Sequence, residues 1–240
     1  TLGNGSNDVL ELVARAFLSP DSSAVFSAHA FAVYPLVTQA IGARANVAAA
    51  HNGSDGPRYS HDLGAMLKAS DTDTRVIFIA NPNNPTGTWL DRAALRAFVE
   101  AVPGHIIVVI DEAYFEYVSE PDYPDTTMWL ADFPNLLVTR TFSKAYGLAG
   151  FRIGYGIMDR EAAQILNRIR QPFNVNTLAQ VAAEAALQDE AFLIKSIDAA
   201  HEGIDYLRAE LTKMGLAPLP TQSNFLMVDV KTDATHVFTA

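Results

Sequence analysis

The sequence predicts an α/β fold of three layers, in which a mostly parallel sheet has helices on both faces. Two observations support this prediction. Apolar runs typical of buried strands recur along the chain, and segments with helical patterns alternate with them; the runs lie at 24–28, 75–80, 106–110 and 136–138. Strands that alternate with helices form parallel sheets whose carboxyl ends point toward one crevice. We therefore expect a ligand site where these four strands end.

The composition is that of a globular protein with an acidic balance of charge. Apolar types make up 49% of the 240 residues, enough for the core of one large domain and part of another. Seventeen basic and 27 acidic side chains give a net charge of −10, so neither nucleic acid nor an anionic membrane is expected as a partner. No apolar run approaches the length of a membrane span.

The chain contains no cysteine, which excludes disulfides, thiolate metal sites and cysteine nucleophiles. This is compatible with a reducing compartment, and we expect a cytoplasmic protein. The six histidines are scattered and form no metal-ligand pair at helical spacing, so no metal site is expected.

A glycine-rich turn at 3–8 opens the first predicted helix. Glycines such as Gly5 let the backbone approach a ligand closely, and the free amide groups at a helix start favour an anion. An ordinary helix cap is the alternative. Because no strand precedes this turn, we expect the chain to begin inside a domain.

Two candidate ligand contacts follow the first two strands. Phe31, after the strand at 24–28, could stack on an aromatic cofactor, although aromatic rings at such places also pack in cores. Asn84 lies in the turn 81–87, where two Asn-Pro pairs enforce a rigid backbone and we expect a cis Asn-Pro bond. That rigidity would aim the Asn84 amide at a ligand; a simple turn is the alternative.

Asp111 follows the strand at 106–110 directly, and Tyr114 lies three residues later. A carboxylate after a buried strand is costly unless it meets a positive partner. If that partner is a pyridinium nitrogen, Asp111 keeps it protonated and the ring can withdraw electrons. A helix-capping aspartate is the alternative.

Lys144 is the leading candidate for a catalytic residue, because it lies just past the strand at 136–138. A lysine there can form a Schiff base with a carbonyl cofactor. The hydroxyl groups of Thr141 and Ser143 and the guanidinium of Arg152 are suited to a phosphate dianion. The alternative is a loop with an exposed lysine and a salt-bridged arginine.

Beyond Arg152 the pattern changes. A polar turn at 171–177 leads to an alanine-rich helix, and a long helix follows with an apolar stripe from Ile194 to Met214. Residues 223–230 are predicted to be a strand of a smaller α+β domain. We expect a large domain at 1–190, and at 191–240 a connecting helix with a small domain that is cut short.

Six motifs resemble those of the fold type I, class I/II pyridoxal-phosphate-dependent aminotransferases, and among them the histidinol-phosphate aminotransferases. They are Gly-Asn-Gly-Ser at 3–6, Asn-Pro-Asn-Asn-Pro-Thr-Gly at 81–87, Asp-Glu-Ala-Tyr at 111–114, Thr-Phe-Ser-Lys-Ala-Tyr-Gly-Leu-Ala-Gly-Phe-Arg at 141–152, Gln-Pro-Phe-Asn-Val-Asn at 171–176 and Ser-Asn-Phe at 223–225. The first four are shared by many relatives, whereas the last two favour the histidinol-phosphate branch.

The resemblance implies a role for each candidate residue. Lys144 would form the Schiff base with pyridoxal 5'-phosphate and later move the substrate proton, and Asp111 would pair with the ring nitrogen. Asn84 and Tyr114 would bond the ring hydroxyl, and Phe31 would stack on the ring, where many relatives have tyrosine. The phosphate would be held by the remaining candidates, which are the turn at Gly5, the amides of Ser6 and Asn7, and Thr141, Ser143 and Arg152.

The implied function is amino transfer between histidinol phosphate and 2-oxoglutarate in histidine biosynthesis, by a homodimer. The N-terminal arm of the family and its C-terminal, carboxylate-binding arginine are not found in these 240 residues. Three alternatives remain: a phosphothreonine decarboxylase-like enzyme, an aromatic aminotransferase, and a non-catalytic protein that binds pyridoxal phosphate.

Overall fold

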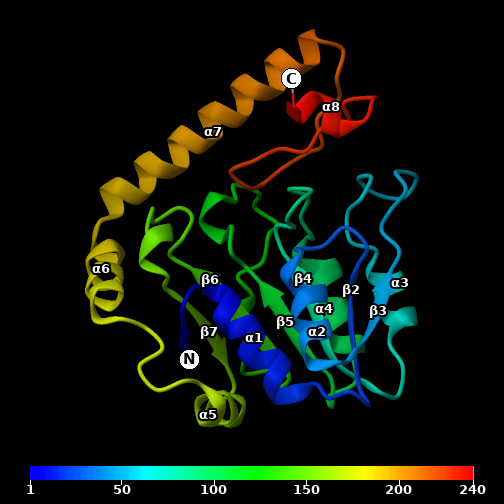
Figure 1. Cartoon of the computed structure of the whole chain (residues 1–240). Helices are drawn as coiled ribbons and strands as arrows, with labels where there is room; N and C mark the ends of the chain where they lie inside the picture. The colour runs from blue at the N-terminus through cyan, green and yellow to red at the C-terminus, as the bar shows by residue number, and fades with distance from the viewer. Residues whose placement is uncertain (240) are drawn as a thin grey trace.

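Seven strands form one sheet in the order β1-β7-β6-β5-β4-β2-β3 in the computed structural model, which describes residues 1–239 (Figure 1). The strands β2 to β6 run parallel to one another, whereas β7 runs antiparallel to both β6 and β1. Their bounds are β1 Leu2–Gly3, β2 Ser23–Ser27, β3 Arg44–Ala48, β4 Thr74–Ala80, β5 Ile107–Asp111, β6 Leu136–Thr141 and β7 Gly154–Met158. The predicted α/β class with a mostly parallel sheet is confirmed.

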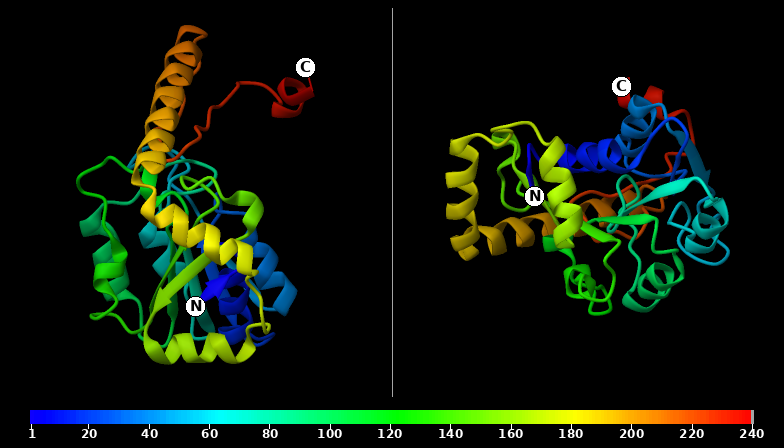
Figure 2. Two further views of the ribbon diagram at one scale, coloured as in Figure 1. Left: turned by 90° about the vertical axis from the view of Figure 1, so that its left-hand side faces the viewer. Right: turned by 90° about the horizontal axis from the view of Figure 1, so that it is seen from below.

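Helices cover both faces of the sheet, as the views in Figure 2 show. One face carries α1 (Ser6–Phe17), α2 (Val33–Ile41) and α5 (Arg160–Ile169), and the other carries α3 (Leu63–Ala69) and α4 (Arg92–Ala101). Three short 3-10 helices lie in the connections: η1 Phe115–Tyr117, η2 Thr126–Trp129 and η3 Ala149–Phe151.

The alternation of side chains along the strands explains the two apolar cores. In β4, Val76, Phe78 and Ala80 pack with the cluster under α1 and α2, whereas Ile77 and Ile79 pack with the cluster under α3 and α4. Successive strand residues point to opposite faces, and a sheet covered on both sides needs apolar residues at every position. This is why β4 and β5 are recognisable in the sequence as uninterrupted apolar runs.

The carboxyl ends of the parallel strands meet at one edge of the sheet. Ala80, at the end of β4, pairs with Asp111, and Asp111 pairs with Thr139 of β6. The segments that follow β4, β5 and β6 therefore begin side by side. Both Asn-Pro bonds of the turn after β4, Asn81-Pro82 and Asn84-Pro85, are cis, in agreement with the expectation for this turn.

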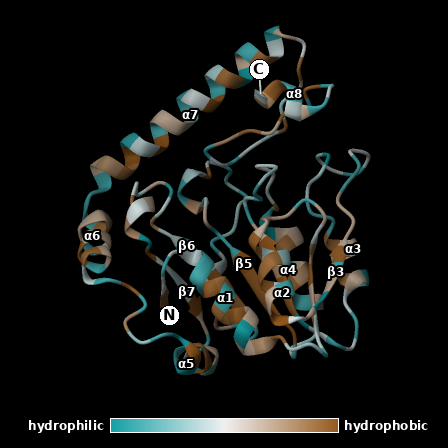
Figure 3. Cartoon of the chain, in the orientation of Figure 1, coloured by the Kyte–Doolittle hydropathy of each residue, from teal (hydrophilic) through white to brown (hydrophobic). Residues whose placement is uncertain are grey.

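The last part of the chain extends away from the sheet (Figures 1 and 2). The helix α6 (Thr177–Gln188) still packs beside the sheet through Ala179 and Ala183, and the long α7 (Glu190–Lys213) then leads away from it to α8 (Ala234–Thr239). The helix α7 confirms the long helix predicted from the apolar stripe, and its residues Leu193 and Ile197 pack against Tyr114 and Tyr117. Further along α7, apolar and polar residues alternate on an exposed surface (Figure 3).

The predicted strand at 223–230 is wrong. Within the described residues this segment makes only the isolated bridge between Pro218 and Val228 and adds no strand to the sheet. Extended backbone becomes a strand only when a neighbouring strand supplies a ladder of hydrogen bonds. Among residues 1–239, no helix is both long enough and apolar enough to span a membrane.

Candidate active site

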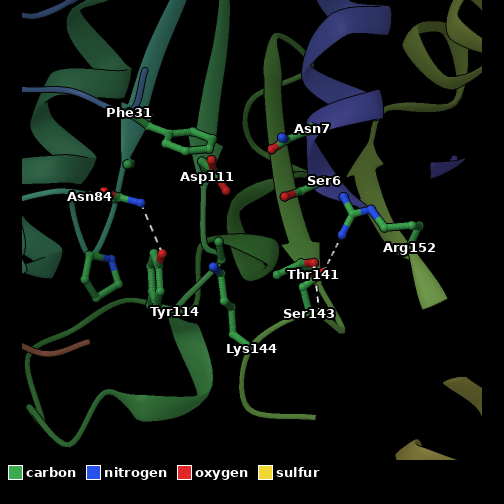
Figure 4. Close-up of a pocket in the computed structure, with 13 residues that line it drawn as sticks. Ser6, Asn7, Phe31, Asn84, Asp111, Tyr114, Thr141, Ser143, Lys144 and Arg152 are labelled. Atoms are coloured by element: carbon green, nitrogen blue, oxygen red, sulfur yellow. Dashed lines mark hydrogen bonds between the residues drawn. The ribbon is translucent and has the colours of Figure 1, made fainter. Parts of the chain in front are cut away.

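A cavity of about 160 Å³ lies at the edge of the sheet where β4, β5 and β6 end (Figure 4). Thirteen residues line it: Ser6, Asn7, Phe31, Ala80, Pro82, Asn84, Asp111, Ala113, Tyr114, Thr141, Ser143, Lys144 and Arg152. Ten of them are residues that the sequence predicted as site candidates. The predicted convergence of these segments on one cavity is thus observed.

One side of the cavity carries aromatic and amide groups. Asn84 Nδ2 donates a hydrogen bond of 3.2 Å to the Tyr114 hydroxyl, and Lys144 Nζ lies 5.3 Å from the centre of the Tyr114 ring. Burial raises the pKa of Tyr114 to about 12, and the charge of Asp111 contributes in the same direction, so the phenol is neutral at physiological pH. Figure 4 shows Lys144 between this side and the hydroxyl-rich side opposite.

The opposite side of the cavity is rich in donors for an anion. Arg152 Nη1 donates to Ser143 Oγ at 3.3 Å and to the Ala149 carbonyl at 3.0 Å, and Nη2 donates to the Asn4 carbonyl at 3.2 Å. The start of α1 supplies Ser6 and faces the same space (Figure 4). Hydroxyls, a guanidinium and a helix start together favour a phosphate-sized dianion.

Gly5 does not line the cavity, but its backbone requires glycine. Its φ of +78° is in the left-handed region, and a Cβ atom there would lie 2.5 Å from Arg152 Nη2. Any side chain at position 5 would displace the guanidinium. The glycine-rich turn therefore supports the site by letting Arg152 lie against the start of α1.

Asp111 is the buried carboxylate of the site, with 3% of its surface exposed. Its Oδ2 accepts a hydrogen bond from the Tyr34 hydroxyl at 3.1 Å, and its Oδ1 accepts one from Thr139 Oγ1 at 3.0 Å. Burial raises the pKa of Asp111, while these two bonds and the charge of Lys144 oppose the rise. A cationic group in the cavity would balance the negative charge of the Asp111 carboxylate.

A second group of charges lies behind the cavity and joins the ends of β5 and β6. Arg140 Nε donates to Glu112 Oε2 at 2.8 Å, and Arg140 Nη2 donates to Asp125 Oδ1 at 2.8 Å. The guanidinium also lies 3.6 Å from the centre of the Phe115 ring. The Glu112 side chain is completely buried, and Thr126 Oγ1 donates to its other oxygen at 2.5 Å. We call Arg140, Glu112 and Asp125 the Arg140 cluster.

Glu116 is a half-buried residue near this cluster, and its buried Oε2 has no hydrogen-bond partner among the residues described. Burial raises its pKa from 4.5 to about 7, and the nearby charge of Arg140 only partly opposes this. The folded protein therefore binds this proton more tightly than the unfolded chain does. Its stability should fall as the pH rises from 4.5 to 7.

The variant Glu116→Gln tests this titration. It should match the parent near pH 4 and exceed it above pH 7 by on the order of 3 kcal/mol in free energy of unfolding, the equivalent of the shift. Urea unfolding at a series of pH values measures the difference. Glu184→Gln on the exposed face of α6 is the control, and a constant difference for Glu116→Gln across pH would contradict the assignment.

Some residues of the site were not predicted from the sequence. Ala80, Pro82 and Ala113 line the cavity through their small or rigid side chains, and Tyr34 and Thr139 support Asp111 from outside it. Tyr34 lies 77 positions from Asp111, so no local pattern reveals that contact. Thr139 occupies the strand position opposite Asp111, and correct pairing of β5 with β6 would have identified it.

Comparisons with known proteins agree with this geometry. The sequence pattern of the family described as aminotransferase class I and II matches residues 1–239. The chain belongs to this aminotransferase family. Its resemblance to these enzymes, which the motifs indicated, is thereby confirmed.

Among the similar members of the family is the histidinol-phosphate aminotransferase 2 of Methylococcus capsulatus, which is 56% identical over 239 of the 240 residues of this chain, a match that covers 64% of that protein. The histidinol-phosphate aminotransferase 2 of Pseudomonas aeruginosa is 52% identical over 240 residues, again all of this chain and 63% of the relative. The chain thus spans a little under two thirds of the length of these curated relatives.

A solved structure of the family shares the fold. The crystal structure of histidinol-phosphate aminotransferase from Sinorhizobium meliloti, in complex with pyridoxal-5'-phosphate, superposes with a TM-score of 0.91 at 31% identity. The match covers 99% of this chain and 63% of that one.

Proposed function

We propose that this aminotransferase binds pyridoxal 5'-phosphate and transfers an amino group from histidinol phosphate to 2-oxoglutarate, a step of histidine biosynthesis in the cytoplasm. The observation that supports this most directly is the presence of Lys144, Asp111 and Arg152 in one cavity of a chain that matches histidinol-phosphate aminotransferases over its whole length. A lysine, a buried carboxylate and a set of phosphate donors are the groups that this cofactor requires.

The residues present fit the cofactor. The donor-rich side around Ser6, Thr141, Ser143 and Arg152 suits its phosphate, and the close approach at Gly5 leaves the guanidinium room to lie there. Asp111 would pair with the ring nitrogen, and Asn84 and Tyr114 would hydrogen-bond to the ring hydroxyl. Phe31 would stack on one face of the ring. The Asn7 amide would complete the phosphate contacts.

Each of these residues has a physical task. When bound, pyridoxal phosphate supplies a carbonyl group and a ring that withdraws electrons from the substrate Cα. Lys144 Nζ would bind that carbonyl, and after substrate displaces it the free amine would take the proton from Cα. Asp111 would hold a proton on the ring nitrogen, because its buried carboxylate stabilises a cation beside it. Phe31 would keep water from one face of the ring.

A screen of amino donors tests the proposed reaction. The purified protein is loaded with pyridoxal phosphate and offered histidinol phosphate, aromatic amino acids and phosphothreonine, each with 2-oxoglutarate. We expect glutamate to form with histidinol phosphate and not in the Lys144→Ala control. Release of carbon dioxide from phosphothreonine would instead support a decarboxylase. Preference for aromatic donors would support an aromatic aminotransferase, and cofactor binding without turnover would support a non-catalytic protein.

Asp111→Asn should retain the cofactor but slow the reaction. The variant keeps the size of the side chain and loses the charge that balances a protonated ring nitrogen. Losing one partner of a buried charge pair costs about 2–5 kcal/mol, which corresponds to roughly 30- to 4,000-fold in kcat. Stopped-flow measurement of Cα proton removal at saturating cofactor checks this. An asparagine variant with the parental rate would contradict the role of Asp111.

We also propose a homodimer. Apolar side chains are unusually exposed near α6: Phe173 is 96% exposed, Leu178 73% and Val181 61%. Such residues commonly lie in interfaces between copies. Light scattering should give twice the chain mass, and Phe173→Asp should shift the protein toward monomer. A parent protein that is monomeric at all concentrations would exclude the dimer.

A further inference from the structure

We propose that Tyr34 is a positioning residue of the active site, which holds Asp111 in place as a charged acceptor without entering the cavity itself. Tyr34 is the second residue of α2 and is completely buried, and it is not among the residues that line the cavity. The inference rests on the proposed function, because it concerns how Asp111 would meet the ring nitrogen of the cofactor.

The carboxylate of Asp111 is held from two sides by hydroxyl groups. Tyr34 donates to Oδ2 at 3.1 Å and Thr139 donates to Oδ1 at 3.0 Å, so each oxygen accepts one bond from the protein. Tyr34 comes from α2 and Thr139 from the adjacent strand β6. Rotation of the carboxylate would break both bonds, and its orientation is therefore fixed before any ligand binds.

The Tyr34 ring is itself held in a fixed position. It stacks on Phe78 of β4 at an interplanar angle of 7° with the ring centres 4.9 Å apart. Phe31 lies edge-on to it at 88°, with the ring centres 5.8 Å apart. Phe31 lines the cavity, so Tyr34 contacts two cavity residues, Phe31 and Asp111, from behind. A shift of Tyr34 would move both the stacking ring and the carboxylate.

Packing alone does not account for a tyrosine at this position. A phenylalanine would fill the same space between Phe31 and Phe78, and a buried hydroxyl costs about 1–3 kcal/mol unless it is hydrogen-bonded. Among the described residues, Asp111 is the one hydrogen-bond partner of the Tyr34 hydroxyl. The hydroxyl is thus best explained by its contact with the carboxylate.

The direction of the hydrogen bond is also defined. Burial raises the pKa of Tyr34 well above its ordinary value, and the charge of Asp111 adds to the rise, so Tyr34 keeps its proton and donates. The other titratable groups that act on Asp111 or Tyr34 are Lys144 and Tyr114. A hydroxyl that donates to a carboxylate favours its charged form, which is the form that would keep a ring nitrogen protonated.

The variant Tyr34→Phe tests the proposal, because it removes the hydroxyl and keeps the ring. The main measurement is the ¹⁵N chemical shift of the ring nitrogen in bound ¹⁵N-labelled pyridoxal phosphate, which reports its protonation without turnover. One hydrogen bond to a charged group alters such an equilibrium by about 10- to 100-fold. We expect the shift to move toward the unprotonated value, and kcat to fall while the KM for the amino donor changes little.

Matched variants separate this role from a structural one. Tyr117→Phe removes another buried hydroxyl away from Asp111 and should leave the ¹⁵N shift unchanged, and Asp111→Asn gives the limiting value for loss of the carboxylate. Thr139→Val removes the other hydroxyl and should move the shift in the same direction. If Tyr34→Phe does not fold, Thr139→Val still decides whether hydroxyls to Asp111 control the ring nitrogen.

The outcomes distinguish the inference from the proposed function. A parent protein that gives a protonated ring nitrogen, together with an unchanged shift in Tyr34→Phe and Thr139→Val, would overturn the inference alone. A parent protein that shows no bound cofactor signal would overturn the proposed function and the inference with it. Lower thermal stability of Tyr34→Phe with an unchanged shift would reduce Tyr34 to a packing residue and would also overturn the inference.

Discussion

Lys144→Ala is expected to abolish covalent attachment of pyridoxal phosphate and to lower transamination by at least about 10⁴-fold, the upper range for a single acid–base group. No other lysine lines the cavity, so no second amine in the described residues can replace it. The variant would lose both the group that binds the cofactor carbonyl and the group that moves the substrate proton. The noncovalent contacts around Arg152 would remain.

Borohydride reduction followed by mass spectrometry measures the attachment. The parent protein should gain the mass of the reduced cofactor on the peptide that contains Lys144, and Lys144→Ala should gain none. Lys68→Ala on α3, at a distance from the cavity in sequence and fold, is the matched control and should label like the parent. A reducible bond in Lys144→Ala would show that another residue holds the cofactor.

Arg140→Met is expected to destabilise the folded protein by about 3–5 kcal/mol, because it leaves the Glu112 carboxylate buried without its cation. The Glu112 side chain is completely buried and that of Arg140 is 13% exposed, so solvent does little to screen the pair. The same substitution would also remove the contact with Phe115 and the bond to Asp125. The strands β5 and β6, which carry Asp111 and Thr141, would lose the ion pair that joins their ends.

The pH dependence of this variant has a definite sign. Burial raises the pKa of Glu112 above its ordinary 4.5, and Arg140 opposes the rise, so removing Arg140 raises that pKa further. The unfolded chain then binds fewer protons than the folded one, and stability falls as the pH rises above 4.5. The deficit relative to the parent should therefore be smallest in acid.

Urea unfolding of parent and variants at pH 5 and pH 8 checks both statements. Arg96→Met is the matched control, because Arg96 pairs with Glu100 and Asp132 at the surface with 38% of its side chain exposed. Exposed pairs contribute about 0–1 kcal/mol, so this variant should change little. The double variant with Glu112→Met should recover much of the loss. If Arg140→Met unfolds like Arg96→Met, the Arg140 cluster does not stabilise the fold.

The part of the fold that could be predicted is the set of strands buried on both faces of the sheet, because their sequences are apolar at every position. The strands β4, β5 and β6 are continuous apolar runs, and their order along the chain was enough to place Asn84, Asp111 and Lys144 at one edge. The edge strands β1 and β3, and β7 next to β1, were not predicted. β3 is largely exposed, β1 has two residues, and β7 contains Gly154 and Gly156, so none has the apolar pattern of a central strand.

The glycines of β7 have a structural reason that only the fold reveals. A Cβ atom at Gly156 would lie 2.8 Å from Val9 of α1, so the helix packs directly on the strand backbone. Contacts of this kind join distant parts of the chain, as do the Tyr34 bond to Asp111 and the Arg140 bond to Glu112. Local patterns do not contain them, and they depend on strand order and register.

The candidate site was predictable to a similar extent. Residue types such as Lys144 and Asp111 carry chemical meaning at the end of a strand, whereas Tyr34 in a helix looks like any core aromatic. The individual roles of the site residues stay predictions that the experiments above address, and the division into domains near residue 190 stays a prediction as well. The expected strand at 223–230 was wrong because an apolar extended pattern does not specify a pairing partner.

The contact of Arg152 with the start of α1 has a consequence for how the protein is made. The guanidinium of Arg152 reaches the Asn4 carbonyl across 148 positions of sequence, so the proposed phosphate site cannot form in a nascent chain until Arg152 has emerged. At a ribosomal rate of 5–20 residues per second, this interval lasts roughly 7–30 s. A ligand that binds only the completed site stabilises the folded protein by about 2.7 kcal/mol at 100 times its Kd. Supply of such a ligand would thus favour chains long enough to include Arg152 over shorter ones.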